Sequence, residues 1–201
     1  MDIEELLKTI ISDDGKHSRF LNTLSLQENI GARKISASEL PESTTYMVLK
    51  HAAEEHRHAF YLKKQLLKLN PKACPTYEPD YLLAPFSSKC YLNALDIATC
   101  RYLKKTMQLN KREMKYAAYL LVTYAIEVRA DALYPIYQEA LNKAQSKVSV
   151  RSIIIEEQGH LEEMIVQLKH FRKDWEHHAD QIVKLETNLF ENWIADLQQA
   201  V

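Results

Sequence analysis

The sequence predicts an all-α fold of four long helices in two antiparallel pairs, with a long crossover connection between the pairs. The chain has only 3 Gly and 6 Pro in 201 residues. Residues that favour helices, such as Leu, Ala, Glu, Lys and Gln, are abundant instead. Apolar residues also recur at helical spacing, and the turn-forming residues gather at a few places. A chain of this length fits a single domain, which we expect to span residues 1–201.

The first half of the chain contains three expected helices. A short helix over residues 3–11 ends at "DDG", whose Asp-Gly pair is a turn signal. A second helix runs from about Lys16 to Ser38. Pro41 separates it from a third helix at roughly Thr44 to Leu69.

The stretch "NPKACPTYEPDYLLAPF" opens the crossover, because its four prolines exclude a regular helix. Another helical segment follows near Tyr91 to Met107. The helical pattern resumes at Asn110 and passes Pro135, which we expect to kink or interrupt the helix. The next break lies around residue 146.

No proline follows Val150, so the last stretch is too long for one ordinary helix. We therefore expect a bend near Lys173 to His178. The four-helix bundle then covers about residues 16–172, and an amphipathic C-terminal helical extension covers about residues 178–199.

Composition excludes several classes of function. The net charge of -1 gives no indication of nucleic acid or membrane as a partner. Three cysteines without CxxC spacing suggest neither a disulfide framework nor a zinc site. The start "MDIEELLKTI" is acidic where a signal peptide is basic, and no apolar run approaches the length of a membrane span. We expect a cytoplasmic protein.

Two segments share an unusual pattern. "HAAEEHRHAF" (residues 51–60) and "IIIEEQGHLE" (residues 153–162) each place a histidine three residues after the second of two glutamates. These pairs are Glu55 with His58 and Glu157 with His160. Two such matches are weak by themselves in a chain rich in glutamate with 8 His, so the surrounding residues decide their meaning.

Each of the four long helices directs one glutamate toward the expected core. Positions three, four and seven residues apart share a helix face, and on this test apolar residues flank Glu28, Glu55, Glu127 and Glu157. Buried unpaired carboxylates are costly and repel one another. These faces offer no Lys or Arg, whereas two histidines lie one turn from two of the glutamates. A pair of divalent metal ions fits this ligand set. The alternative is a polar seam of the bundle, or a site that has lost its metal.

Register gives a partial check. Glu28 lies thirteen residues before Pro41 and Glu55 fourteen after it, so both lie roughly 20 Å from the turn. Glu127 and Glu157 differ in depth by roughly 12 Å if both helices are straight. The two glutamates therefore match in depth only if the connecting loop is longer than we expect or if Pro135 absorbs the difference. Asp131, one helical turn nearer the loop, is the alternative ligand to Glu127.

This ligand pattern resembles that of the ferritin-like di-iron carboxylate superfamily, over roughly residues 16–172. The matching residues are Glu28, Glu55, His58, Glu127, Glu157 and His160. The resemblance implies two iron ions, with manganese as a possible substitute, bridged by carboxylates from Glu55 and Glu157. It also implies that His58 and His160 each hold one ion, and that dioxygen or peroxide reacts at the site.

The sequence "EEHRH" is also similar to the (D/E)ExRH motif of bacterial di-iron monooxygenases. By that similarity Glu54, Arg57 and Glu156 orient the ligand histidines. The equally open alternative is that these three are solvent-exposed charges beside the site.

Three functions remain open. The first is an oxygenase or hydroxylase of a small or apolar substrate, which needs an external reductase because the chain has no four-cysteine iron module of the rubrerythrin kind. The second is a ferroxidase, or a peroxide-detoxifying protein without an organic substrate. The third is a non-catalytic helical interaction protein with a vestigial site. We favour the first, because the crossover helix and the C-terminal helix could wall a pocket; the C-terminal helix could equally form a homodimer interface.

Three further residues near the expected site have more than one interpretation each. Tyr134 shares a face with Glu127, so it is a core residue, a hydrogen-bond donor to a metal ligand or the carrier of a radical. His51 lies one turn from Glu55 and is either an ordinary core residue or a partner of the site. Gly31, one turn from Glu28, costs about 1 kcal/mol relative to alanine inside a helix. It either ends the helix or leaves room for dioxygen or a substrate.

Overall fold

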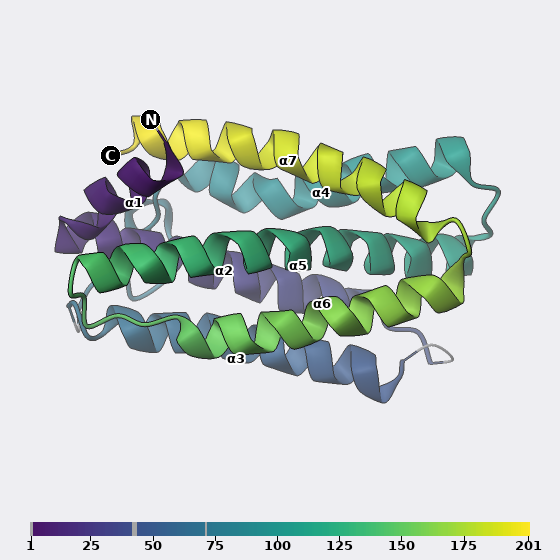
Figure 1. Ribbon diagram of the computed structural model, residues 1–201, viewed down its shortest axis with the longest axis horizontal. Coiled ribbons are helices and arrows are strands. Elements are labelled where there is room, and N and C mark those ends of the chain that lie inside the picture. Colours follow the sequence, from purple (N-terminus) through teal and green to yellow (C-terminus); the bar gives the residue numbers. More distant parts are fainter. Residues whose placement is uncertain (1, 42–43, 71) are drawn as a thin grey trace.

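The computed structural model describes residues 2–41, 44–70 and 72–201 (Figure 1). These residues form seven α-helices and one short 3₁₀-helix, and none of them lies in a β-strand. The all-helical prediction is therefore confirmed. Among the described residues, no helix combines the length and the apolar character needed to cross a lipid bilayer.

The elements follow the expected order along the chain. They are α1 (Ile3–Ile11), α2 (Asp14–Ser38), α3 (Tyr46–Leu66), η1 (Pro79–Tyr81), α4 (Pro85–Thr106), α5 (Lys111–Lys143), α6 (Arg151–Phe171) and α7 (Trp175–Gln199).

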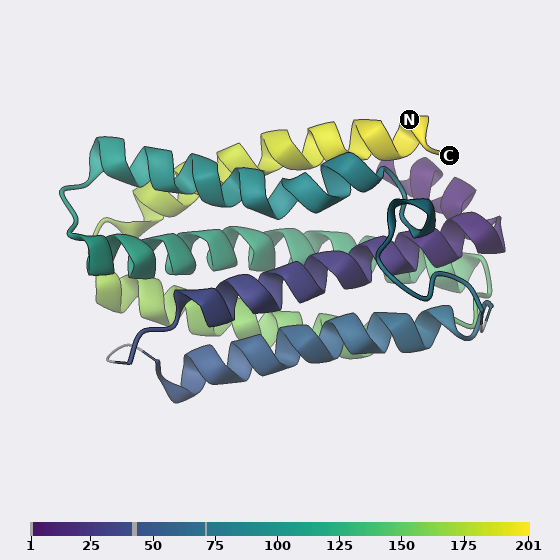
Figure 2. The ribbon, with the colours of Figure 1, turned by 180° about the vertical axis from the view of Figure 1, so that it is seen from behind.

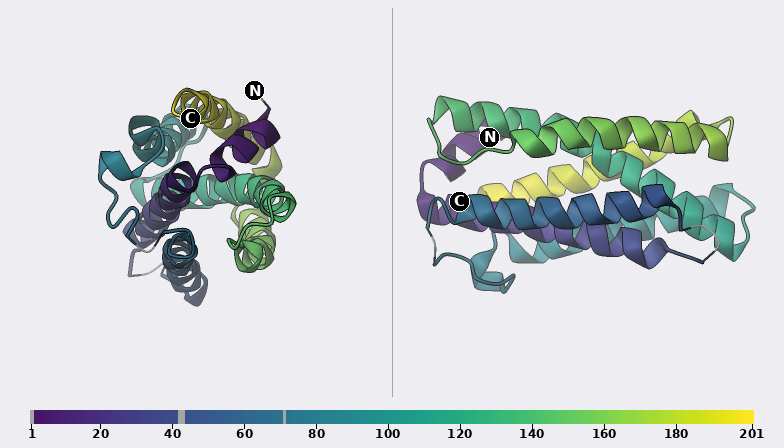
Figure 3. Two further views of the ribbon diagram at one scale, coloured as in Figure 1. Left: turned by 90° about the vertical axis from the view of Figure 1, so that its left-hand side faces the viewer. Right: turned by 90° about the horizontal axis from the view of Figure 1, so that it is seen from below.

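The long helices are arranged as three layers of two. Figure 1 shows α4 and α7 in the upper layer, α2 and α5 in the middle and α3 and α6 below, and the end view in Figure 3 shows the same order. The hairpin pairs are α2 with α3 and α5 with α6. The short α1 packs across one end of the middle layer. The crossover passes from α3 over the outside of α2 to reach α4 (Figure 2).

Polar contacts hold the crossover against α2. The amide Nδ2 of Asn22 donates hydrogen bonds to the backbone oxygens of Thr76 at 2.9 Å and Tyr81 at 2.8 Å. Thr23 Oγ1 accepts a hydrogen bond from the backbone N–H of Leu83 at 2.9 Å. These contacts satisfy backbone groups of a segment that has no regular helix to satisfy them.

The helices at Pro85 and Pro135 differ from those that the sequence led us to expect. The crossover helix begins at Pro85, not near Tyr91. A proline at the first helical position loses no hydrogen bond and has a suitable φ, so it begins the helix. Pro135 lies inside α5, which remains one helix of 33 residues. Of the two effects expected at Pro135, a kink or an interruption, the interruption does not occur. The bend expected after α6 is present between Phe171 and Trp175.

The connection between α5 and α6 removes most of the depth mismatch expected for Glu127 and Glu157. Residues 144–150 run back beside α5, so that the backbone N–H of Val150 donates to Gln138 Oε1 at 2.8 Å. The depth of α6 must therefore be counted from Gln138. Glu127 lies eleven residues before Gln138, and Glu157 lies seven residues after Val150. At 1.5 Å per residue the two glutamates therefore differ in depth by roughly 6 Å.

Two apolar clusters lie on either side of a polar centre. On each of the helices α2, α3, α5 and α6, one cluster holds residues from one half of the helix and the second cluster holds residues from the other half. The inward glutamates lie between the two sets. Apolar burial at both ends therefore holds the four helices at the spacing that brings these carboxylates together.

Candidate metal centre

The six residues that the sequence singled out meet in the interior between the middle and lower layers. Glu28 comes from α2, Glu55 and His58 from α3, Glu127 from α5, and Glu157 and His160 from α6. Five of them are buried, and the side chain of Glu28 is 13% exposed. The helix faces predicted from spacing are therefore correct for all four glutamates.

These residues form two overlapping groups that could each hold a metal ion. One group is Glu28, Glu55, His58 and Glu157, and the other is Glu55, Glu127, Glu157 and His160. In each group one possible ligand atom per residue lies within 4.8 Å of the others. Glu55 and Glu157 belong to both groups, as expected of carboxylates that bridge two ions. Asp131 belongs to neither group.

Both histidines direct Nδ1 into this cluster. His58 Nδ1 lies 3.0 Å from Glu157 Oε1, and His160 Nδ1 lies 3.5 Å from Glu157 Oε2. Neither Nδ1 atom has a hydrogen-bond partner among the described residues, and the same is true of the buried Glu127 Oε2. Buried polar atoms without partners are rare in folded proteins, so these three atoms fit a cation that the cluster would hold.

The other nitrogen of each histidine is held by a carboxylate from the opposite helix. His58 Nε2, on α3, donates to Glu156 Oε2 on α6 at 2.9 Å. His160 Nε2, on α6, donates to Glu54 Oε2 on α3 at 2.8 Å. A proton on Nε2 leaves the lone pair of a neutral imidazole on Nδ1, facing the cluster.

This crossed arrangement decides between the two interpretations of the neighbouring charges. The side chains of Glu54 and Glu156 are 24% and 28% exposed, so they reach water but also orient the imidazoles. Arg57 forms an ion pair with Glu156 at the surface. All three therefore act on the histidines, directly or through one contact.

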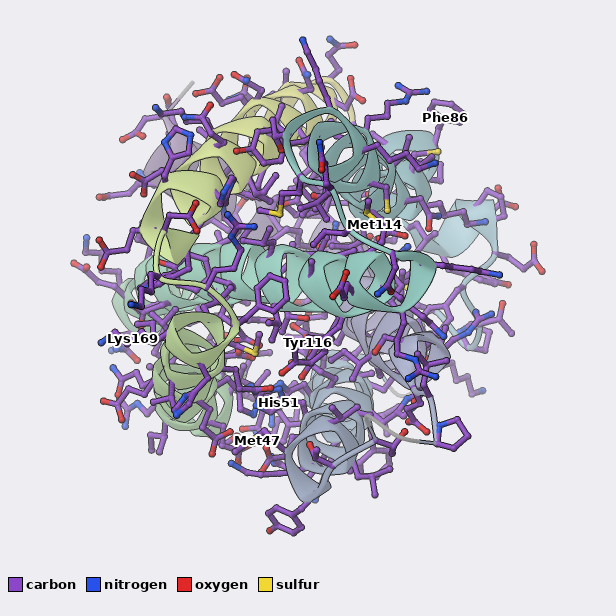
Figure 4. The ribbon with its side chains drawn as sticks, turned by 90° about the vertical axis from the view of Figure 1, so that its right-hand side faces the viewer. Met47, His51, Phe86, Met114, Tyr116 and Lys169 are labelled. Carbon is purple, nitrogen blue, oxygen red and sulfur yellow. The ribbon has the colours of Figure 1, made fainter. Side chains whose placement is uncertain are left out.

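A third histidine extends the polar centre toward one end of the bundle. His51 is fully buried, and its ring centroid lies 4.8 Å from that of His160. Its Nε2 contacts Glu163 at 2.9 Å, and Lys50 also pairs with Glu163. Figure 4 shows His51 between α3 and α6, below Tyr116 on α5. Glu163 was not among the predicted site residues. Its position three residues after His160 puts it on the same helix face, and this spacing could have indicated it.

Burial and mutual repulsion disfavour the charged forms of three of the carboxylates. Burial, followed by the charges of Glu28, Glu157 and Glu127, raises the pKa of Glu55 well above its usual range. Burial and the charge of Glu157 do the same to the pKa of Glu127. Burial also raises the pKa of Glu28. Without a cation the cluster therefore retains protons at neutral pH.

Glu157 and His160 show where the cluster stabilises positive charge. Burial acts to raise the pKa of Glu157, but its close polar contacts with Glu127, His160 and His58 outweigh burial and lower that pKa below its ordinary value. Burial lowers the pKa of His160, but its contacts with Glu127 and Glu157 raise it to about 11. Protons thus supply, in the metal-free cluster, positive charge that a metal ion would replace.

An elongated cavity of about 540 Å³ reaches the cluster from the side of α4. Glu28, Glu55 and Glu127 line it together with apolar residues of α2, α4 and α5. Gly31 also lines it and does not end α2, which continues to Ser38. A Cβ at Gly31 would lie 3.7 Å from Glu55 Oε2, so a larger side chain here would fill the space beside that carboxylate. This outcome favours the interpretation of Gly31 as a residue that leaves room.

Two tyrosine contacts define the deep part of this cavity. The Tyr134 hydroxyl donates a hydrogen bond to Glu28 Oε1, and both residues line the cavity. Tyr91 donates to Glu186 of α7, which also forms a paired salt bridge with Arg129 at 2.9 and 2.8 Å. Glu186 is only 1% exposed. Nothing in the local sequence indicated this network, which fastens α7 to α4 and α5 beside the cavity.

Comparison with known proteins gives no match: no family model fits the chain, and none of the curated proteins and none of the solved structures is significantly similar to it. The function must therefore be argued from the site. What the structure establishes is a buried group of glutamates and histidines that could hold a metal ion.

Proposed function

We propose that this protein is a non-haem oxidoreductase with a dinuclear iron or manganese centre, built on a ferritin-like bundle of α2, α3, α5 and α6. The observation that carries the proposal is the pair of overlapping four-residue groups that share Glu55 and Glu157. Four carboxylates balance the charge of two divalent ions, and one imidazole per group completes a ligand set typical of this class.

The residues of the chain prepare the site in three ways. Glu54 and Glu156 hold the imidazoles so that each Nδ1 faces the cluster. The Tyr134 hydroxyl donates to Oε1 of Glu28, and Oε2 lies within the cluster, 3.9 Å from His58 Nδ1, where it would act as the ligand atom. The two apolar clusters exclude water from both ends. A reduced metal pair, when bound, supplies the electrons that activate dioxygen or peroxide.

The cavity supports an oxygenase or hydroxylase over a ferroxidase. It brings an apolar surface to three of the six candidate ligands, and its volume of about 540 Å³ is that of a site for an organic ligand. A ferroxidase needs only a path for hydrated iron ions, for which a largely apolar lining is unsuitable. Electrons would then come from an external reductase, and we further propose that the protein is a homodimer.

The deciding experiment measures metal content and dioxygen consumption by the same preparation. After anaerobic reconstitution we expect close to two iron or manganese ions per chain, and no bound metal would refute the proposal. Dioxygen consumption that needs an added organic substrate and a reductase supports the oxygenase. Consumption coupled only to added ferrous iron, together with a cage-sized particle in light scattering, supports the ferroxidase instead.

A further inference from the structure

We propose that the cavity binds a single-chain amphiphile whose anionic head group lies at the cavity mouth and whose apolar chain extends toward Glu28, Glu55 and Glu127. The identification of this ligand as the substrate rests on the proposed function. The ligand class itself rests on the shape, the lining and the charge of the cavity.

The shape of the cavity suits a chain, not a compact molecule. Its lining along α5 runs from Lys111, at the first position of that helix, past Glu127. These two residues are sixteen positions apart, which corresponds to roughly 24 Å along the helix axis. A volume of about 540 Å³ spread over that length leaves a narrow channel. A linear ligand fills such a channel with the most contact per atom.

The wall of the channel between its two ends is mostly apolar. Residues of three helices contribute to it: Leu24 and Ile35 from α2, Leu92 from α4, and Ala118, Val122 and Ile126 from α5. Each methylene that leaves water for such a wall contributes about 0.8 kcal/mol. The wall therefore selects for hydrocarbon, and it offers little to a sugar, a nucleotide or a peptide backbone.

The mouth of the channel carries an excess of positive charge. Lys34, Lys104, Lys111 and Lys115 line this end, where α2 and α4 end and α5 begins, and Asp96 is the acidic residue among them. Met114, labelled in Figure 4, lies at the same end between α4 and α5.

Two of these lysines are already engaged and two are available. Lys34 pairs with Asp96 at 3.0 Å, and Lys115 donates to the backbone oxygen of Glu39 at 3.2 Å. Lys104 and Lys111 are exposed, and neither forms an ion pair within the described residues. The mouth thus has two free ammonium groups and, in Asp96, a carboxylate that is already neutralised. An anionic head group such as a carboxylate or a phosphate ester complements this charge.

Together the two ends fix the orientation of the ligand. A head group held by Lys104 and Lys111 places the far end of the chain beside Glu28, Glu55 and Glu127. Chemistry at the candidate metal centre would then occur on the part of the chain remote from the head group. In the reverse orientation the anionic head group would lie at the candidate metal centre. The lysines would then have no partner, and the negative charge of the head group would face the desolvated carboxylates of the centre.

The test is calorimetric titration of the full-length, metal-free protein at low ionic strength. The probes are sodium dodecanoate, dodecyl phosphate and dodecyltrimethylammonium, each below its micelle concentration, and dodecanol below its solubility limit. Dodecanoate or dodecyl phosphate should bind at one site per chain, more tightly than the alcohol, and the cation should bind weakest. Along the series octanoate, decanoate and dodecanoate, the binding affinity should increase by roughly fourfold for each added methylene. The two anions show which head group the mouth prefers.

Variants locate the binding. Lys104→Glu combined with Lys111→Glu should weaken dodecanoate binding by roughly tenfold, an effect that added salt reduces. Lys8→Glu combined with Lys105→Glu is the matched control, because both lysines are exposed, lie outside the cavity lining and give the same change in net charge. Val122→Trp should abolish binding by filling the channel, and circular dichroism checks that this variant is folded.

The outcomes separate this inference from the proposed function. Absence of saturable dodecanoate binding, equal affinity for all four head groups, or an equal loss in the control would overturn the inference. A protein that takes up two metal ions but no amphiphile refutes the inference and leaves the metal centre intact. A protein that binds dodecanoate in the channel but takes up no metal supports the ligand class and refutes the proposed function.

Discussion

Replacement of Glu157 by glutamine is the sharpest test of the candidate centre. Glu157 belongs to both four-residue groups, and its two oxygens lie 3.0 Å from His58 Nδ1 and 3.5 Å from His160 Nδ1. Glutamine has nearly the same shape but carries no charge, and it cannot bridge two cations with equivalent oxygens. We therefore expect Glu157→Gln to lose both ions and not only one.

The magnitude follows from the burial of the site. Glu157 is 2% exposed, so a change in its charge is poorly screened by water. Removing one partner of a buried charge pair costs about 3–5 kcal/mol. At 1.4 kcal/mol per tenfold change, metal affinity should fall by roughly a hundredfold to a few thousandfold. Thermal unfolding provides a second assay, because an ion present at a hundred times its Kd adds about 2.7 kcal/mol of stability.

Glu162→Gln is the matched control, because Glu162 is an exposed residue five positions further along α6. Both variants and the parent are reconstituted with ferrous iron without oxygen, passed through a desalting column and analysed for metal per chain. The control should retain close to two ions and the full metal-induced rise in Tm. Retention of both ions at unchanged affinity by Glu157→Gln would refute the bridging role, as would an equal loss in the control.

Three further predictions follow from the geometry. Glu28→Gln and Glu127→Gln each alter one group only, so each should retain close to one ion per chain by metal analysis; loss of both ions from either variant contradicts the two-group arrangement. The raised pKa of Glu127 and the pKa of about 11 of His160 mean that a metal must displace protons at neutral pH. Metal affinity measured at pH 6, 7 and 8 should therefore rise with pH, whereas a constant affinity would contradict proton displacement. Arg129→Ala leaves the buried Glu186 without its cation, which costs about 3–5 kcal/mol and should lower the Tm of the metal-free protein by roughly 6–20 °C. An unchanged Tm would show that the Arg129–Glu186 pair contributes nothing to the stability of the fold.

Helical periodicity explains why the composition of the site could be predicted. Whether a residue faces the core depends on apolar neighbours three and four positions away, and this information is local in the sequence. For this reason Glu28, Glu55, Glu127 and Glu157 all proved to point inward. The same reasoning predicted that His58 and His160 face inward, because a residue three positions after an inward glutamate lies on the same helix face.

Relations between helices could not be predicted in the same way. The partner of His58 is Glu156 on α6, and the partner of His160 is Glu54 on α3, although each acid is a near neighbour of the other histidine in the sequence. Crossed contacts of this kind depend on the distance and rotation between α3 and α6. The pairing of Arg129 with a glutamate 57 positions away has the same origin.

The amino-acid sequence by itself determined that this protein is helical, where most of its helices begin and end, and which acidic and imidazole groups its four long helices direct inward. These properties depend on spacing within one helix, which a linear pattern records directly. Only the tertiary structure decided that the groups meet at one depth, since the return of residues 144–150 to Gln138 sets the register of α6. It also decided that a cavity reaches them, because the packing of α4 on α2 and α5 leaves that space open, and packing between distant segments is not encoded in any local pattern.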